Sequence, residues 1–424
     1  MSTFFSRAQT VSLPSLESAF RFADTSSFVM DQANIQEKLA KLTTNASYGN
    51  VLNPRIPVTG ALTNNTNLQV SFIPAEIFGG PAGTFREVTM GQQYITSLTI
   101  APQFDIINPG HLSDMKSARL NEEVVQWQNK QSKQDLYDQI NSAYHNILSF
   151  QAQIGVLQRH VEIADSILKI VEGKNTLGMV RAQDLNDATI NLIQYQNKLD
   201  QAKTAVENQY FMLAILLDTE KSLEVSADLW AYSPTMESSL ATGDLSVKSY
   251  LAREAYAKQT WRSAQWNQLP TLSFVSSLSW QNNSNAKFMD PAQRWINANY
   301  LGLRLSWDFP TNVQKLTTSS NAKLNFQLAE EAADHARLQT TFQNQQMNND
   351  YEKALSDYES ALRVFVLEEN SFGHLLNQYD ADLVALDKLL AGQVKLMAAR
   401  LNVASALATV AFTKEKINIH NSIR

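Results

Sequence analysis

Two different periods of apolar residues run along this chain, and they occupy separate segments. Residues 271–281 and 299–309 alternate between apolar and polar positions, and in the second segment Leu301, Leu303 and Leu305 are separated by glycine or arginine. Successive side chains of a strand point to opposite faces, so this period of two predicts strands with one apolar and one polar face.

Residues 56–73 and 94–104, in the first half of the chain, predict strands of the same kind. Segments of about 9–11 residues have the length that a tilted strand needs to cross a bilayer. A half-buried soluble hairpin would show the same alternation, so the strands alone leave both interpretations open.

Long stretches of helical period follow each pair of predicted strands. Residues 112–171 contain no proline and carry an apolar stripe, and roughly 60 helical residues would extend about 90 Å. Apolar residues from Leu185 to Val206 then alternate steps of three and four, which is typical of a coiled coil. The second half of the chain repeats both features. The predicted helical hairpins cover residues 112–217 and 315–418.

The chain therefore contains two copies of one strand–strand–helix–helix unit. The first structural repeat is predicted to cover residues 1–217 and to begin with an N-terminal helix near residues 16–42. Residues 218–243 form a turn-rich linker or equatorial segment. The second repeat covers residues 244–424 and opens with a helix at residues 245–266.

Four strands in one chain are too few to close a barrel. In lipid an open sheet edge leaves backbone groups unpaired at a cost of several kcal/mol each, so only closed barrels span membranes as sheets. Three chains would supply twelve strands, an even number within the range of roughly 8 to 26. The predicted fold class is mainly α with a transmembrane β-barrel, in which a trimeric barrel continues into a coiled-coil tunnel.

The composition excludes several classes of function. The chain has no cysteine, which excludes disulfides and cysteine-bound metals. The six histidines lack zinc-site spacing, and no phosphate-binding glycine loop or G-x-S-x-G motif occurs. A net charge of -6 with scattered basic residues does not suit nucleic acid. We therefore expect no enzyme activity, no catalytic residue, no cofactor and no metal.

The pattern of apolar residues also predicts neither a membrane-spanning helix nor an export signal. No run of 18 or more apolar residues occurs, so we expect no spanning helix. Residues 1–7 are too short and too polar for the apolar part of a signal peptide. An exported protein with this sequence would therefore have lost its signal.

Aromatic residues gather in the predicted strand region. Trp280, Trp295, Tyr300 and Trp307 are candidates for a girdle at the membrane interfaces, where amphipathic rings are favoured. Aromatic residues are equally common in the core of a soluble sheet, so this second interpretation stays open.

The turn between the first two long helices resembles that of the TolC, or outer membrane efflux protein, family. Gly178 is followed six residues later by Asp184 and then by Asp187 and alanine, as at the helical tips of that family. The second copy differs, because Ala381 stands where the tip glycine is expected and Leu390 replaces the second aspartate. The resemblance extends over residues 14–417.

This resemblance implies a homotrimer in the outer membrane that extends into the periplasm. It implies a passive exit duct of a tripartite efflux or type I secretion system, whose tips meet a periplasmic adaptor protein and an inner-membrane pump. Acidic residues near the tips would narrow the aperture and form rings of three carboxylates. A helix cap or a solvated acid is the simpler interpretation of each. The candidates are Asp387, Asp184, Asp187, Asp380 and Asp382.

Two other classes of protein fit parts of the pattern. A soluble coiled-coil scaffold with a small β-domain would need no detergent. A periplasmic adaptor also has coiled-coil hairpins, but normally a single one, and the internal duplication argues against it.

Overall fold

The computed structural model describes residues 10–234, 240–309 and 313–423, so residues 1–7, considered above for a signal, lie outside the described part. The chain folds into two compact units, and each predicted repeat contributes to both of them. The first unit consists of Met1–Lys38, Val124–Ala252 and Glu330–Arg424, and the second of Leu39–Glu123 and Arg253–Ala329.

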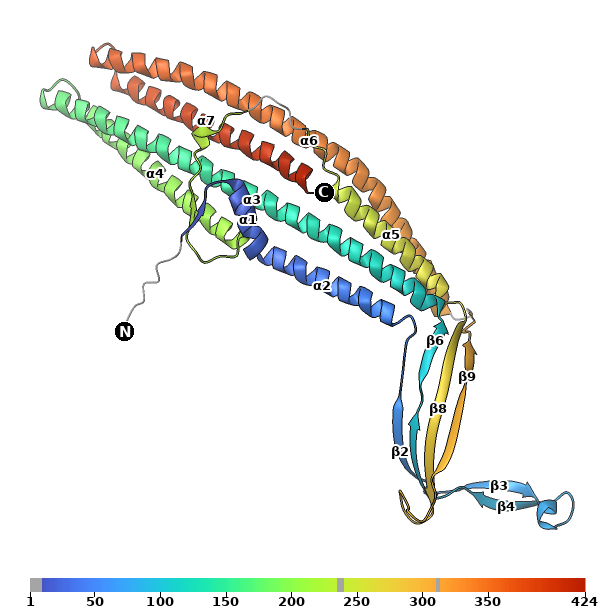
Figure 1. Cartoon of the computed structure of the whole chain (residues 1–424). Coiled ribbons are helices and arrows are strands. Elements are labelled where there is room, and N and C mark those ends of the chain that lie inside the picture. Colours follow the sequence, from blue (N-terminus) through green and yellow to red (C-terminus); the bar gives the residue numbers. More distant parts are fainter. Residues whose placement is uncertain (1–9, 235–239, 310–312, 424) are drawn as a thin grey trace, which may run out of the picture. The chain divides into compact units, whose positions relative to one another are not determined.

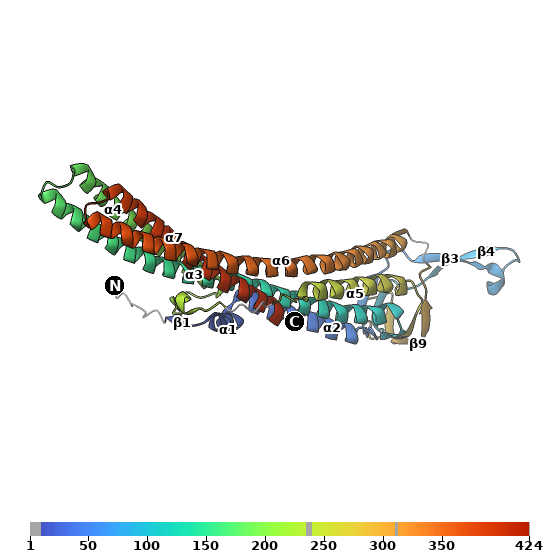
Figure 2. The ribbon, with the colours of Figure 1, turned by 90° about the horizontal axis from the view of Figure 1, so that it is seen from above.

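Two antiparallel helical hairpins dominate the first unit (Figures 1 and 2). The first consists of α3 (Pro109–Thr176) and α4 (Ala182–Leu216), and the second of α6 (Val313–Asp380) and α7 (Leu386–Ser422). Helices α3 and α6 have 68 residues each, about 100 Å at the usual rise, and both begin in the second unit.

Apolar side chains of three or four helices meet in the core of this unit. Leu157 of α3, Tyr195 of α4 and Met397 of α7 are buried in one cluster. A second cluster, nearer the tips, includes Phe372 of α6 and Leu389 of α7. The heptad seams of the sequence thus pack the two hairpins against each other as well as internally.

Helix α7 is apolar enough in composition to resemble a membrane span, contrary to the expectation that no helix would be. It has an 18-residue window with a mean hydropathy of 1.4, but half of that window is buried within the chain. Buried alanine and valine residues, such as Ala404 and Val410, account for this composition. Helix α7 therefore has the character of a core helix of the first unit.

The N-terminal helix of the prediction is two helices, α1 (Leu16–Ser26) and α2 (Phe28–Gly49). The chain leaves the helical conformation at Ser27, which is buried and extended in its backbone. The hydroxyl of Ser26 donates to the carbonyl oxygen of Leu217 at 2.8 Å. This tertiary bond fixes the break, which the apolar period of the sequence does not reveal.

A small equatorial layer packs against the middle of α3. Strand β1 (Val11–Leu13) pairs in parallel with β7 (Leu223–Val225), and η2 (Leu229–Ala231) follows. Buried residues of this layer share one core with α3. The helix predicted at residues 245–266 is α5 (Leu245–Trp266).

The second unit contains an antiparallel sheet (Figure 1). Strand β8 pairs with β9 along one edge and with β5 and then β6 along the other, and β2 pairs with β5. The predicted strand 94–104 is thus interrupted at Ala101 and Pro102, because proline cannot donate to the ladder. The strands are β2 (Val58–Asn64), β5 (Tyr94–Ile100), β6 (Gln103–Ile107), β8 (Thr271–Ser284) and β9 (Ile296–Ser306).

The predicted strand 56–73 is wrong in extent. After β2 the chain turns at Asn65 and forms a separate two-stranded sheet from β3 (Gln69–Pro74) and β4 (Phe85–Met90). The side chain of Asn65 donates to the carbonyl oxygen of Gln92, which closes the base of this hairpin. The hairpin projects from the end of the sheet, with η1 (Ala75–Phe78) at its tip (Figure 1).

Candidate functional site

The pairing register of the large sheet places most of its large apolar side chains on one face. Residues directly opposite each other share a face, so Leu303 lies beside Phe274, and Leu98 beside Trp280. Phe274 and Trp280 are half-buried, but much of this face is exposed: Leu303 is 66% accessible and Leu305 is 71% accessible. Large exposed members of this apolar face are Val58, Leu62, Leu98, Phe104, Leu278, Leu301, Leu303 and Leu305.

The opposite face of the same sheet is mainly polar, although Val275, Ile95 and Ile296 also lie on it. Ser273 lies beside Arg304 and Ser277 beside Tyr300 on this face. The hydroxyl groups of Thr99 and Ser279 are 3.1 Å apart, a cross-strand hydrogen bond. A sheet with an exposed apolar face and a polar reverse side is typical of a barrel that faces lipid outside and water inside.

Both outer edges of the sheet lack a pairing partner among the residues that the structure describes. Within the described ranges β2 pairs only with β5, and β9 only with β8. The two edges run antiparallel to each other, since each strand between them reverses direction. A second copy could therefore continue the ladder by pairing its β2 with the first copy's β9.

The four predicted interface aromatics do not form a single belt. Trp280 lies on the apolar face, whereas Tyr300 lies on the polar face opposite Ser277. Trp295 precedes β9 and is 45% exposed. Trp307 follows β9, and its Nε1 donates to the carbonyl oxygen of Gln268 at 3.0 Å.

Trp280 and Trp307 lie near opposite ends of the apolar face. Ser306, next to Trp307, pairs with Thr271, nine residues before Trp280 on β8. Nine strand residues extend about 30 Å, or about 23 Å along the normal at a tilt of about 40°. This span agrees with the apolar band of about 25 Å in outer-membrane barrels.

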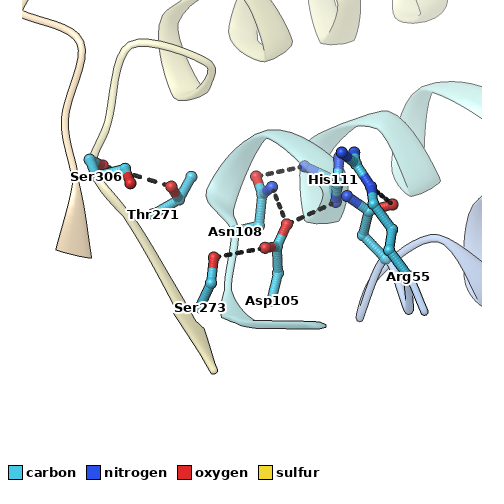
Figure 3. A network of polar contacts seen from close by, with 8 residues as sticks. Arg55, Asp105, Asn108, His111, Thr271, Ser273 and Ser306 are labelled. Atoms are coloured by element: carbon cyan, nitrogen blue, oxygen red, sulfur yellow. Dashed lines mark hydrogen bonds and ion pairs between the residues drawn. The ribbon is translucent and has the colours of Figure 1, made fainter. Parts of the chain in front are cut away.

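A buried aspartate joins the sheet to the start of α3 (Figure 3). Asp105 of β6 accepts hydrogen bonds from the side chains of Asn108 and Ser273, both at 2.7 Å, and Nδ1 of His111 lies 3.5 Å from its Oδ2. Oδ1 of Asn108 in turn accepts from the backbone amide of His111, which caps the helix. This cluster was not predicted, although an aspartate in an apolar strand before Asn-Pro is a sequence signal for it.

The two helical tips have the same turn. Gly178 has φ 70°, and the amide of Met179 donates to the carbonyl oxygen of Lys174 at 2.9 Å. In the second tip Asp382 has φ 58°, and the amide of Leu383 donates to Gln378 at 2.8 Å. This is the hydrogen bond of a Schellman motif in both cases.

The equivalence of the tips corrects the sequence alignment by one residue. Asp382, rather than Ala381, takes the position of the tip glycine. Asp387 therefore corresponds to Gln183, and Ala391, rather than Leu390, corresponds to Asp187. A short polar aspartate can adopt the left-handed conformation that other residues avoid, so the second tip needs no glycine.

Two of the five acidic candidates form ion pairs. Asp184 accepts from the backbone and the guanidinium of Arg181 at 3.0 Å, and these bonds hold the pKa of Asp184 below its usual value. Asp382 pairs with the ammonium of Lys174, which also donates to the carbonyl oxygen of Tyr379. Both of these carboxylates therefore have structural partners.

The other three candidates are exposed. Asp187, Asp380 and Asp387 form no ion pair within the described part of the chain. Asp387 and Asp187 nonetheless act electrostatically on Arg181, since both contribute to raising its pKa after the larger effects of Asp184. The structure thus brings acids from both tips around one arginine.

A buried polar layer that was not predicted links α3, α4 and α7. Asn191 of α4 donates to the side-chain oxygen of Gln393 of α7 at 2.8 Å. The amide of Gln393 donates to the backbone carbonyl of His160 of α3 at 3.1 Å, and the His160 ring stacks on Tyr195. The signal for this layer in the sequence is the presence of amide side chains at helix positions that face the core.

Comparisons with solved structures identify this fold. No protein-family model matches the sequence, and a search of curated proteins finds no match. The structure is similar to the outer membrane protein VceC from Vibrio cholerae, with a TM-score of 0.77 and 13% identity over 96% of this chain and 95% of that chain. It is also similar to the CmeC outer membrane channel of Campylobacter jejuni (TM-score 0.74, 13% identity, 96% and 85% covered).

The open state of the MtrE outer membrane channel of Neisseria gonorrhoeae has the same architecture, with a TM-score of 0.73 and 12% identity over 97% of this chain and 89% of that chain. The chain therefore has the fold of the TolC-like outer membrane efflux channels. The prediction of a mainly α fold with a β domain is confirmed, and the trimeric transmembrane barrel stays a prediction.

Proposed function

We propose that this chain is one protomer of a homotrimeric outer-membrane duct through which solutes leave the cell passively. The observation that carries the proposal is the large sheet, with an exposed apolar face, a polar reverse side and two unpaired edges. Pairing β2 of one copy with β9 of the next would close a ring of three copies and satisfy the edge groups. The apolar face would then contact lipid.

The helical hairpins supply the periplasmic part of the proposed duct. The similar structures described above are an outer membrane protein and two outer membrane channels, and this likeness supports a role as the exit duct of a tripartite efflux system. By the family resemblance, the tips would meet a periplasmic adaptor and an inner-membrane pump. A type I secretion system would use the same kind of duct.

The exposed acids at the tips are proposed to line the entrance. In a trimer Asp387, Asp187 and Asp380 would each form a ring of three carboxylates, which favours cations at a narrow opening. Asp184 and Asp382 would contribute less charge because Arg181 and Lys174 already neutralise them. Gly178 and Asp382 would shape the turns that carry these residues.

Fluorescent labels on the two faces of the sheet test the proposal. The chain has no cysteine, so Leu303→Cys and Tyr300→Cys each give one labelling site, on the apolar and polar faces respectively. In liposomes a polarity-sensitive dye at Leu303 should be quenched by nitroxide-labelled lipid, and the same dye at Tyr300 by aqueous iodide. Equal quenching of both dyes by iodide would contradict the proposal. Ion conductance across a planar bilayer would show that the inserted particle is a duct.

A further inference from the structure

The β3–β4 hairpin, residues 66–91, carries an apolar surface that no residue of the described part of the chain covers; we call this hairpin the arm. Phe72 and Phe85 lie on one face of its small sheet and are 64% and 66% exposed. Ile77 and Phe78 at its tip are 71% and 52% exposed. A two-stranded hairpin is marginal in water, so a surface of this kind requires a partner to cover it.

The loop between β8 and β9, residues 285–295, offers a matching surface at the same end of the sheet; we call it the rim loop. It exposes Met289 at 61% and Trp295 at 45%, and Ile296 beside it at 48%. The loop sits at the end of the sheet where Asn64 ends β2, because Asn64 pairs with Tyr94 and Tyr94 pairs with Ser284.

Buried polar contacts hold the rim loop in one conformation. Asp290 accepts from the hydroxyl of Ser284 at 2.6 Å and from the amide of Ala292 at 3.0 Å. The side chain of Asn282 donates to the carbonyl oxygens of Asp290 and Gln293. A loop that is ordered before it binds loses less entropy on association, which suits a docking surface.

The charges of the arm and the rim loop are opposite. The arm contains Glu76, Arg86 and Glu87 and has a net charge of -1, whereas the rim loop contains Lys287, Asp290 and Arg294 and has a net charge of +1. Glu87 lies on the same face as Phe72, and neither Glu87 nor Arg294 has an ion-pair partner among residues that the structure describes. The arm has no excess of cationic residues that would favour an anionic lipid surface.

We propose that the arm of each protomer docks on the rim loop of the neighbouring protomer and clasps the trimer at its outer rim. This inference rests on the proposed trimer. The arm directly follows β2, and the rim loop directly precedes β9. Strands β2 and β9 are the two edge strands that would pair between copies. That pairing brings the arm of one copy to the same end as the rim loop of the next. The apolar face of Phe72 and Phe85 then covers the exposed side chains of the loop, and Glu87 meets Arg294 or Lys287.

Cysteine cross-linking in the purified full-length particle tests the contact. The double variant Glu87→Cys/Arg294→Cys, oxidised in detergent, should run as covalent dimer and trimer on a non-reducing gel. Arg86→Cys/Arg294→Cys is the matched control, because Arg86 lies on the other face of the arm, over Phe78. This control should give few cross-linked products. A cross-link between the two introduced cysteines of one chain would give a band at the monomer mass.

A charge exchange gives an independent measurement. Glu87→Arg alone should lower the temperature at which the trimer dissociates in dodecyl sulfate, and Glu87→Arg/Arg294→Glu should restore it. An intact trimer without cross-links and without this rescue would overturn the docking of the arm and leave the proposed duct standing. A particle that is not a trimer would overturn both. Quenching of a dye at Phe72→Cys by nitroxide lipid, in an intact trimer, would assign the arm to the membrane and also overturn the docking.

Discussion

Asp382 at the tip of the second helical hairpin has the left-handed backbone conformation that Gly178 has at the tip of the first. The two turns share their hydrogen bonds although the residues differ. A β-branched residue is strongly disfavoured in this conformation, at a cost of roughly 1–2 kcal/mol. We therefore expect Gly178→Val to open the first tip, while Asp382→Gly preserves the second. Hydrogen exchange should quicken at the amide of Met179 in the first variant and stay protected at Leu383 in the second.

The exposed acids and the ion-paired acids at the tips should differ in their effect on permeation. Asp387→Asn removes an unpaired charge, so we expect it to lower the cation preference of the proposed channel. Asp184→Asn is the matched control and should change selectivity less, because Arg181 already neutralises Asp184. Reversal potentials in a salt gradient measure this preference. Equal effects of the two substitutions would contradict the assignment of Asp387 to the entrance.

A cationic side chain should be tolerated on one face of the sheet and not on the other. Leu303→Arg places a charge on the apolar face, where a mid-membrane arginine costs about 2–4 kcal/mol. Tyr300→Arg, three residues away on the polar face, should have little effect. The yield of heat-resistant trimer extracted from membranes measures the difference. Similar yields for both variants would show that the apolar face does not contact lipid.

Two buried histidines should make the helical hairpins less stable in acid. Burial lowers the pKa of His145 and of His160 to about 4, from an ordinary value of 6.5, and nearby Arg400 and Arg159 add to the effect at His160. Between pH 6.5 and 4 the unfolded chain therefore binds more protons than the folded chain. The free energy of unfolding decreases as the pH is lowered through this window, by at most about 1.4 kcal/mol per pH unit for each histidine.

The double variant His145→Gln/His160→Gln separates this effect from the titration of carboxylates. Urea unfolding followed by helix circular dichroism at pH 7 and at pH 5 should show a smaller loss of midpoint in the variant than in the wild type. The same loss in both proteins would mean that the two histidines do not cause the acid sensitivity.

The amide pair between α4 and α7 should behave as a coupled unit. Asn191→Leu leaves the fully buried Gln393 without its donor, and we expect a loss of about 1–3 kcal/mol. The double variant Asn191→Leu/Gln393→Leu should lose less than the sum of the single variants, because an apolar pair leaves no orphaned amide at this contact. Urea midpoints of all four proteins complete the cycle. Simple additivity would contradict the coupling.

Elements set by local periodicity could be predicted from the sequence. The heptad seams and the long stretches without proline predicted the helical hairpins, and alternation at Leu301, Leu303 and Leu305 predicted β9 and its apolar face. These patterns repeat over many residues, so single exceptions do not obscure them.

Features that depend on one tertiary bond could not be predicted in this way. The break at Ser27 relies on a hydrogen bond to Leu217, and the end of β2 relies on Asn65 bonding Gln92 across the base of the arm. The predicted alignment of the two tips was wrong by one residue, because Asp382 has the backbone conformation of the tip glycine but is not a glycine. Hydrogen-bond partners far apart in the sequence determine where such elements end, and hydrophobic periodicity carries no information about these partners.

The mass of the purified particle in detergent tests the central claim most directly. We expect a detergent-bound trimer, with a protein mass of three times 47.5 kDa and a detergent belt at one end in negative-stain images. A monomer or dimer that stays monodisperse in water, without a belt, would contradict the account and favour a soluble coiled-coil scaffold.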